Sequence, residues 1–383
     1  MMPLTTVGHP VHRAVAVALT VAAMALVACG GGSPKTSDAA GATVTPSLGM
    51  VSEDAFVASG KARDDILAAQ RRTGVQLLRQ TFSWPAIEPR RGRYRFGVYD
   101  DFMAATARAG IQVLPLVFGV PAFRAAKRVR GATVTATTVQ PPRRPADMAA
   151  FITVLIKRYG PAGSFWRTHP EVPRRPIEAW QVWNEPNLPA YWGGRPSAKE
   201  YVALLRTVHR AIRAADPTAQ TITAGLPDSR TGIGLDRYLR QMLAAGAKGT
   251  FDGLAIHPYA VTSSGVMSAV RHARRLLDGG GLRGATLWVT EFGWSSGGPR
   301  SSFTVGEKRQ AALVLQTITG LAKQARALRL RSIVYYDWRD AAPYRGKGDF
   351  WGLHTGLLNR DGSAKPALST YYQAAGVLGA LPK

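Results

Sequence analysis

Eight short apolar segments recur along the chain, each of a suitable length for one β-strand. Each segment is a nearly continuous apolar run rather than an alternating one. This indicates strands that are buried on both faces, and hence a parallel sheet. The eight predicted strands are 47–51, 75–82, 111–118, 177–184, 221–226, 251–259, 286–294 and 331–338.

Amphipathic segments between these strands predict helices. Ser197 and Glu200 have the spacing of a capping box before an apolar helical face, and Thr304 and Glu307 repeat that spacing. Alternating strands and helices in a chain that is 46% apolar predict one α/β domain over 46–383, a (β/α)8 TIM barrel. The alternative is an open doubly wound sheet, which needs a Gly-rich phosphate turn after an early strand, and none is present there.

The first 28 residues have the pattern of an export signal. Residues 14–28 are apolar and uncharged, which suits the central segment of a signal peptide better than a membrane span. They lead into LVACG (26–30), which resembles the lipobox of bacterial lipoproteins and holds the only cysteine, Cys29. The resemblance implies cleavage before Cys29, lipidation of its sulfur, and a protein anchored on the cell-surface or periplasmic side of the membrane. The alternative is a buried N-terminal helix with an incidental cysteine. Residues 29–45, rich in Gly and Ser, predict a flexible tether.

The formal net charge of +25 would attract polyanions such as nucleic acid, anionic lipid or acidic polysaccharide. The basic residues are scattered along the chain. This indicates that the charge reflects the overall amino-acid composition rather than one binding site. The export signal and the lack of a basic–aromatic motif argue against nucleic acid as a partner. With a single Cys, and no H-E-x-x-H spacing among its seven His, the sequence predicts neither a disulfide framework nor a metal site.

Two glutamates follow apolar strands. Glu185 lies in WQVWNEPN (180–187) and Glu291 in LWVTEFGW (287–294). Alone, Glu185 is also compatible with a residue at a helix start, and Glu291 with a loop salt bridge. Together they end two strands that would face one another across the mouth of the barrel, where the active sites of this fold are built. Two facing carboxylates, one protonated and one ionised, are the groups that glycoside hydrolysis needs.

These two motifs resemble the fourth- and seventh-strand signatures of glycoside hydrolase clan A, which includes the family 5 cellulases and the family 39 xylosidases. The resemblance extends over about 46–380. Other matching positions fall in the same order along the chain: Arg79 toward the end of the second strand, His257 and Tyr259 at the end of the sixth, and Trp338 at the end of the eighth. One departure is the lack of a histidine over 115–123, where family 5 has one. This favours another family of the clan, family 39 among them.

The resemblance implies Glu185 as the general acid/base and Glu291 as the nucleophile of a retaining hydrolase that acts on O-glycosidic bonds without a cofactor. The implied substrate-binding residues are Arg79, Asn184, His257, Tyr259 and Trp338. Arg79 would keep Glu291 ionised, Tyr259 would orient it, Asn184 would bind the sugar 2-hydroxyl, and Trp338 would stack on the sugar. The expected partner is a carbohydrate, and the sequence does not determine the oligomeric state.

A catalytically silent barrel that binds cell-wall or acidic polysaccharide is the alternative function. The presence of both carboxylates argues against it, because a protein that only binds has no need of the pair.

Overall fold

The computed structural model describes residues 45–126, 139–343 and 348–382. The predicted signal peptide, Cys29 and all but the last residue of the predicted tether lie outside these ranges. Within them, no helix is long and apolar enough to cross a membrane.

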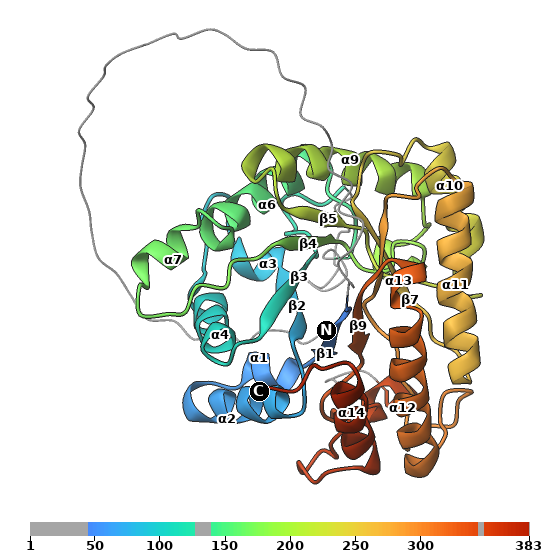
Figure 1. The fold of residues 1–383 in the computed structure, drawn as a ribbon. Helices are drawn as coiled ribbons and strands as arrows, with labels where there is room; N and C mark the ends of the chain where they lie inside the picture. The colour runs from blue at the N-terminus through green and yellow to red at the C-terminus, as the bar shows by residue number, and fades with distance from the viewer. Residues whose placement is uncertain (1–44, 127–138, 344–347, 383) are drawn as a thin grey trace, which may run out of the picture. The chain divides into compact units, whose positions relative to one another are not determined.

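The strands form a closed parallel barrel surrounded by helices (Figure 1). Their bounds are β1 Ser47–Val51, β2 Leu77–Ser83, β3 Gln112–Phe118, β4 Ala179–Val182, β5 Gln220–Ile222, β6 Leu226–Pro227, β7 Gly253–His257, β8 Thr286–Val289 and β9 Leu330–Tyr335. Pairing of β1 with β9 and of β5 with β7 closes the ring. The two-residue β6 continues the path of β5 along β7, so the predicted fifth strand is one barrel strand with an interruption. This confirms the predicted eight-stranded barrel.

The helices alternate with the strands in the order expected for this fold. Their bounds are α1 Glu53–Val57, α2 Gly60–Arg72, α3 Trp84–Ile87, α4 Gly97–Arg108, α6 Pro145–Tyr159, α7 Ser164–Thr168, α8 Pro189–Trp192, α9 Ala198–Ala215, α10 Leu235–Ala244, α11 Ser263–Gly279, α12 Glu307–Lys323, α13 Ala325–Leu328, the 3₁₀ turn η1 Trp351–His354 and α14 Pro366–Val377.

The two predicted helix starts have different outcomes. The hydroxyl of Ser197 accepts a hydrogen bond from the Glu200 N–H at 3.2 Å, so it caps α9 as predicted. Thr304 does not cap α12. That helix begins at Glu307, after Gly306 in a left-handed conformation (φ 79°), and the Thr304 hydroxyl donates to the Pro299 carbonyl instead.

Apolar side chains fill both sides of the strands. The larger cluster lies between strands and helices, while a smaller cluster takes one residue from each of seven strands: Val51, Leu77, Leu114, Ile222, Ala255, Trp288 and Val334. Burial on both faces explains why the strands read as continuous apolar runs.

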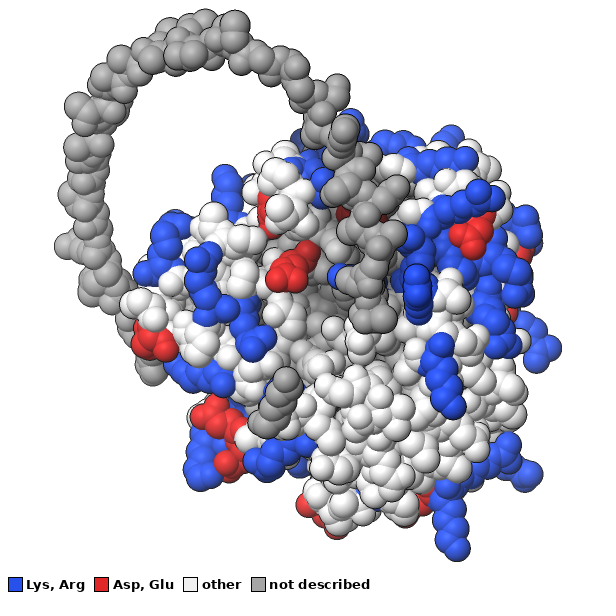
Figure 2. All heavy atoms as spheres, in the orientation of Figure 1, with Lys and Arg blue, Asp and Glu red and all other residues white. Residues whose placement is uncertain are grey.

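The charged side chains do not gather into a single patch on the face shown in Figure 2. Lys and Arg are spread around its periphery. This agrees with the scattered distribution in the sequence.

Candidate active site

Glu185 lies three residues beyond the end of β4, in a backbone conformation that ordinary side chains rarely adopt. Both Trp183 (φ 75°) and Glu185 (φ 44°) have positive φ. The Glu185 N–H donates to the Gly225 carbonyl at 3.2 Å, and Asn184 forms a bridge with Gly225. The strained turn is thus tied to the neighbouring strand, as is common where a backbone fixes the direction of a functional side chain.

Glu291 lies two residues beyond the end of β8, and both of its oxygens are held. Arg79 Nη1 donates to Oε1 at 2.6 Å, and Tyr259 Oη donates to Oε2 at 2.9 Å. The carboxylate therefore has a fixed orientation and a cation beside it.

His257 lies between the two glutamates. Its Nδ1 is 2.7 Å from Glu185 Oε1, and its Nε2 is 3.6 Å from Glu291 Oε1. The imidazole is fully buried. Gly225 borders the ring so closely that a Cβ at this position would lie 1.9 Å from Nε2. The position must therefore be glycine for His257 to keep this place.

Arg79 is fixed by two further side chains. Its Nε donates to Gln181 Oε1 at 2.6 Å, and its Nη2 donates to Asn184 Oδ1 at 2.8 Å. Gln181 in turn donates to the Thr223 carbonyl and to the Thr290 hydroxyl, next to Glu291. This network connects β2 and β4 with the segment that follows β8. Among the described residues, the Asn184 amide N–H groups have no hydrogen-bond partner and are available to a substrate.

The two glutamates have opposite pKa shifts. Burial raises the pKa of Glu185 above its ordinary value near 4.5; the Glu291 charge adds to this, while His257 and Arg79 oppose it. Burial would also raise the pKa of Glu291, but His257, Arg79 and the Tyr259 hydrogen bond outweigh it and lower the pKa. At mildly acidic pH, this arrangement favours a protonated Glu185 beside an ionised Glu291.

The structure brings together every predicted site residue of the barrel except Trp338. This side chain is only 2% exposed and belongs to the core between strands and helices, so it has no ring face free for a sugar. The buried ring gives no support to the stacking role predicted for Trp338, which stays a prediction. The apolar strand pattern continues past the end of β9 at Tyr335, so hydropathy did not show that Trp338 lies beyond the strand.

Three half-buried aromatic residues instead form a cluster that includes Tyr259, the hydrogen-bond donor to Glu291. The ring of Tyr259 is 5.3 Å from Trp351 and 6.0 Å from Phe303, and the latter two rings are 4.7 Å apart. They come from the loops after β7, β8 and β9. Trp84, Trp192 and Trp294, which also follow strands in the sequence, are buried in the core.

Sequence reasoning missed Gln181 and Gly225. Gln181 had a recognisable signal, since it is a polar residue inside the otherwise apolar β4. Gly225 had none, because its close contact is with a residue 32 positions away in the sequence.

Glu185, His257 and Glu291 also have the donor atoms of a metal site, since one ligand atom from each lies within 4.8 Å of the others. However, His257 Nδ1 and Glu185 Oε1 already bind one another, and Arg79 and Tyr259 already bind both oxygens of Glu291. The guanidinium beside Glu291 would also repel a cation. The arrangement is better suited to proton transfer between its own groups.

Two family models match the chain. The model described as glycosyl hydrolase catalytic core matches residues 160–371, and the one described as beta-galactosidase matches residues 58–117. The search of curated proteins gave no match.

Solved structures share the fold at low sequence identity. A family 39 glycoside hydrolase from Bacteroides cellulosilyticus WH2 is 22% identical over 88% of this chain and 64% of its own, with a TM-score of 0.60. A monomeric beta-xylosidase from Caulobacter crescentus CB15 is 18% identical over 86% of this chain and 67% of its own (TM-score 0.61). The GH53 catalytic domain of Ignisphaera aggregans is 18% identical over 87% of this chain and 97% of its own (TM-score 0.56). The present chain thus spans less than two thirds of the family 39 hydrolase but nearly all of the GH53 catalytic domain.

Proposed function

Because the chain belongs to the glycosyl hydrolase catalytic core family, we propose that it cleaves O-glycosidic bonds by double displacement, with retention of the anomeric configuration. The observation that carries this proposal is the pair Glu185 and Glu291. Their pKa values shift in opposite directions, and a carboxylate oxygen of one lies within 4.8 Å of a carboxylate oxygen of the other. Retaining enzymes have carboxyl groups about 5–5.5 Å apart, whereas inverting enzymes separate them by about 6.5–9.5 Å to admit a water molecule.

In the first step, Glu291 attacks the anomeric carbon while Glu185 transfers its proton to the departing glycosidic oxygen. The C–O bond to the leaving group breaks, and an ester bond forms between the sugar and Glu291. Arg79 and Tyr259 support this step because they keep Glu291 ionised and correctly oriented.

In the second step, Glu185, now a carboxylate, takes a proton from water. The resulting hydroxide attacks the anomeric carbon, the ester bond breaks, and Glu291 is released. His257 contacts both glutamates and can stabilise the negative charge as it passes from one to the other. The free amide N–H of Asn184 supports a hydrogen bond to the sugar 2-hydroxyl, and the ring cluster around Trp351 offers apolar faces to a sugar.

We also propose that the protein is exported and anchored by lipid at Cys29. This rests on the sequence of residues 1–30 alone. It would place a carbohydrate-cleaving barrel where extracellular or cell-wall glycans are accessible.

A panel assay tests the reaction and the roles of the two glutamates. The wild-type chain is compared with its Glu291→Gln and Glu185→Ala variants on aryl β-xylosides and β-galactosides, as the relatives suggest, and on polysaccharides. Glu291→Gln should be inactive on every substrate. Glu185→Ala should lose about 10²–10⁴-fold on poor leaving groups and far less on activated aryl groups, which need no proton. NMR of the first-formed sugar should show the substrate's anomeric configuration.

An inverted product would refute double displacement. Full activity of Glu291→Gln would refute the assigned nucleophile. A well-folded wild-type protein that cleaves nothing but retains polysaccharide would instead favour the silent, carbohydrate-binding barrel.

A further inference from the structure

The glutamine of β4, Gln181, lies inside the barrel. Ala179, two residues before it and on the same face of the strand, packs against the small apolar cluster. Gln181 itself is fully buried. A buried amide must find its hydrogen bonds within the protein, because an unpaired polar group costs free energy. The partners of Gln181 therefore indicate why a polar residue occupies this otherwise apolar strand.

The neighbours of Gln181 determine which end of its amide is the oxygen. Arg79 Nε lies 2.6 Å away and can only donate, so it faces the Oε1 acceptor. The Thr223 carbonyl lies 3.2 Å away and can only accept, so it faces the Nε2 donor. Nε2 also lies 3.3 Å from the Thr290 hydroxyl. The position thus needs an acceptor and a donor side by side, and an amide provides both.

Arg79 is held at three nitrogens by three different side chains. Gln181 binds Nε, Asn184 binds Nη2, and Glu291 binds Nη1. The Arg79 side chain is only 4% exposed, so water could not replace a lost partner. Without the Gln181 oxygen, Nε would be buried and unpaired, and the guanidinium would gain free energy by turning toward another acceptor. Such a turn would weaken its ion pair with Glu291.

Gln181 is neutral, and this matters for the charge of Arg79. Among the described residues, Glu291 is the one carboxylate that forms an ion pair with Arg79, at 2.6 Å. The other titratable groups around Glu291 are His257, Tyr259 and Glu185. Burial alone would raise the pKa of Glu291, and His257 and Arg79 oppose it. Of these groups, only the guanidinium is positively charged at every working pH.

We propose that Gln181 is a positioning residue for the reaction, which holds the Arg79 guanidinium against the nucleophile and leaves its charge undivided. The naming of Glu291 as nucleophile rests on the proposed function. Gln181 acts through Arg79 and does not touch the substrate. Loss of its amide should let the guanidinium turn, which weakens the ion pair and raises the pKa of Glu291.

The test measures the pKa of Glu291 directly in the full-length chain. The chain has only eight glutamates, so ¹³C labelling of their side-chain carboxyl groups gives a simple spectrum, in which Glu291→Gln identifies the signal. Gln181→Met removes the amide and keeps the length of the side chain. We expect it to raise the pKa of Glu291 by about one pH unit. Gln181→Leu, with a similar volume, takes its place if the methionine variant does not fold.

A double-mutant cycle shows whether Gln181 acts through Arg79. In an Arg79→Met background, Gln181→Met should leave the pKa of Glu291 unchanged, because the guanidinium that it positions is gone. A purely structural role of Gln181 would instead give the same rise in both backgrounds.

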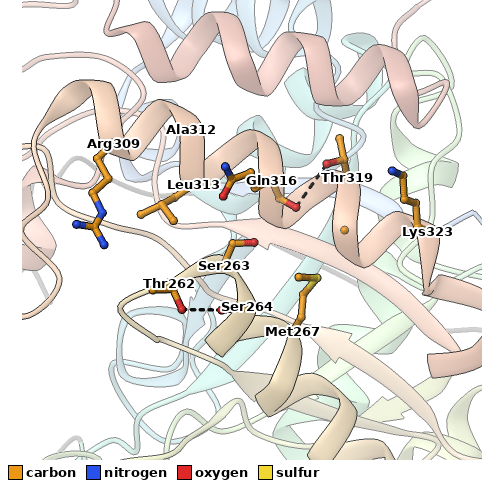
Figure 3. A pocket seen from close by; sticks show the side chains of 11 residues that line it. Thr262, Ser263, Ser264, Met267, Arg309, Ala312, Leu313, Gln316, Thr319 and Lys323 are labelled. Carbon is orange, nitrogen blue, oxygen red and sulfur yellow. Dashed lines mark hydrogen bonds between the residues drawn. The ribbon is translucent and has the colours of Figure 1, made fainter.

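Two other glutamines provide matched controls. Gln70 is also fully buried, but its amide donates to the Ser52 hydroxyl at 2.6 Å and not to a site residue. Gln316 is exposed on α12, in a groove between α11 and α12 on the outside of the barrel (Figure 3). Gln70→Met should lower the melting temperature and Gln316→Met should not. Neither should change the pKa of Glu291.

An unchanged pKa of Glu291 in Gln181→Met would overturn the proposal. An equal rise in Gln70→Met, or an equal rise in the Arg79→Met background, would overturn it as well. In the active enzyme, the acid limb of kcat/KM should move to higher pH by the same amount as the pKa. If the limb stays in place although the pKa rises, Gln181 does not serve the reaction and the proposal fails.

Hydrolysis of glycosides separates this proposal from the catalytic one. A protein that hydrolyses no glycoside, but in which Glu291 titrates as expected in every variant, would refute only the catalytic proposal. An active enzyme in which Gln181→Met leaves the titration of Glu291 unchanged would refute only the role of Gln181.

Discussion

At the scale of single residues, the site depends on His257 and the glycine beside it. The imidazole contacts both glutamates, and Gly225 leaves just enough room for it. The Gly225 carbonyl also accepts the Glu185 N–H, so one residue positions both the acid and the histidine. A substitution at Gly225 should therefore alter catalysis, although Gly225 acts through Glu185 and His257 and not through the substrate.

Gly225→Ala should displace the His257 ring, because the new Cβ would lie 1.9 Å from Nε2. A displacement of this kind should lower kcat by about 10²-fold. Kinetics and circular dichroism of the variant measure this. Gly97→Ala is the control, since its Cβ would meet no atom within 4 Å. Wild-type kcat in Gly225→Ala would show that the position of His257 does not matter.

The pKa shifts of the two glutamates predict a bell-shaped pH dependence. Activity should fall as pH drops through the lowered pKa of Glu291, below 4.5, because the nucleophile becomes protonated. It should also fall as pH rises through the raised pKa of Glu185, above 4.5, because the acid loses its proton. The basic limb should disappear in Glu185→Gln on an activated aryl glycoside. If the basic limb persists in Glu185→Gln, a group other than Glu185 causes the loss of activity at high pH.

At the scale of elements, the predicted strands extend beyond the real ones at the end where the site lies. The prediction 177–184 became β4 Ala179–Val182, and 286–294 became β8 Thr286–Val289. The apolar pattern continues because the loops after the strands are buried as well. Hydropathy reports burial, so it cannot mark where a buried strand becomes a buried turn.

Helix starts depend on single side chains, and α9 offers a clear test. Ser197→Ala should lower the free energy of unfolding by about 0.5–2 kcal/mol, because the cap to the Glu200 N–H is lost. Ser197→Asp keeps an acceptor and should remain within a few tenths of a kcal/mol of the wild type. Urea denaturation measures both variants. Equal stabilities of Ser197→Ala and wild type would mean that the hydroxyl contributes nothing.

At the scale of the whole molecule, closure of the barrel joins residues that are remote in sequence. Arg79 and Glu291 are 212 positions apart, and they form an ion pair because the carboxyl ends of all parallel strands meet at one end of a barrel. Membrane attachment belongs to the same scale, because it would position the whole barrel on a surface.

Radiolabelled palmitate should be incorporated into the wild-type protein in bacterial cells and not into a Cys29→Ala variant, because the chain has no other thiol. Autoradiography after electrophoresis measures this. A label that persists in the variant, or that never enters the wild type, would refute lipidation at Cys29.

The sequence by itself determined the barrel and the two strand-end glutamates. Continuous apolar runs mark strands buried on both faces, and a carboxylate after such a run must lie near the barrel mouth. Only the tertiary structure decided that Trp338 turns into the core, that Gln181 supports Arg79, and that Gly225 makes room for His257. Periodicity reports whether a residue is buried. Which neighbour it meets depends on how the closed barrel brings distant strands together.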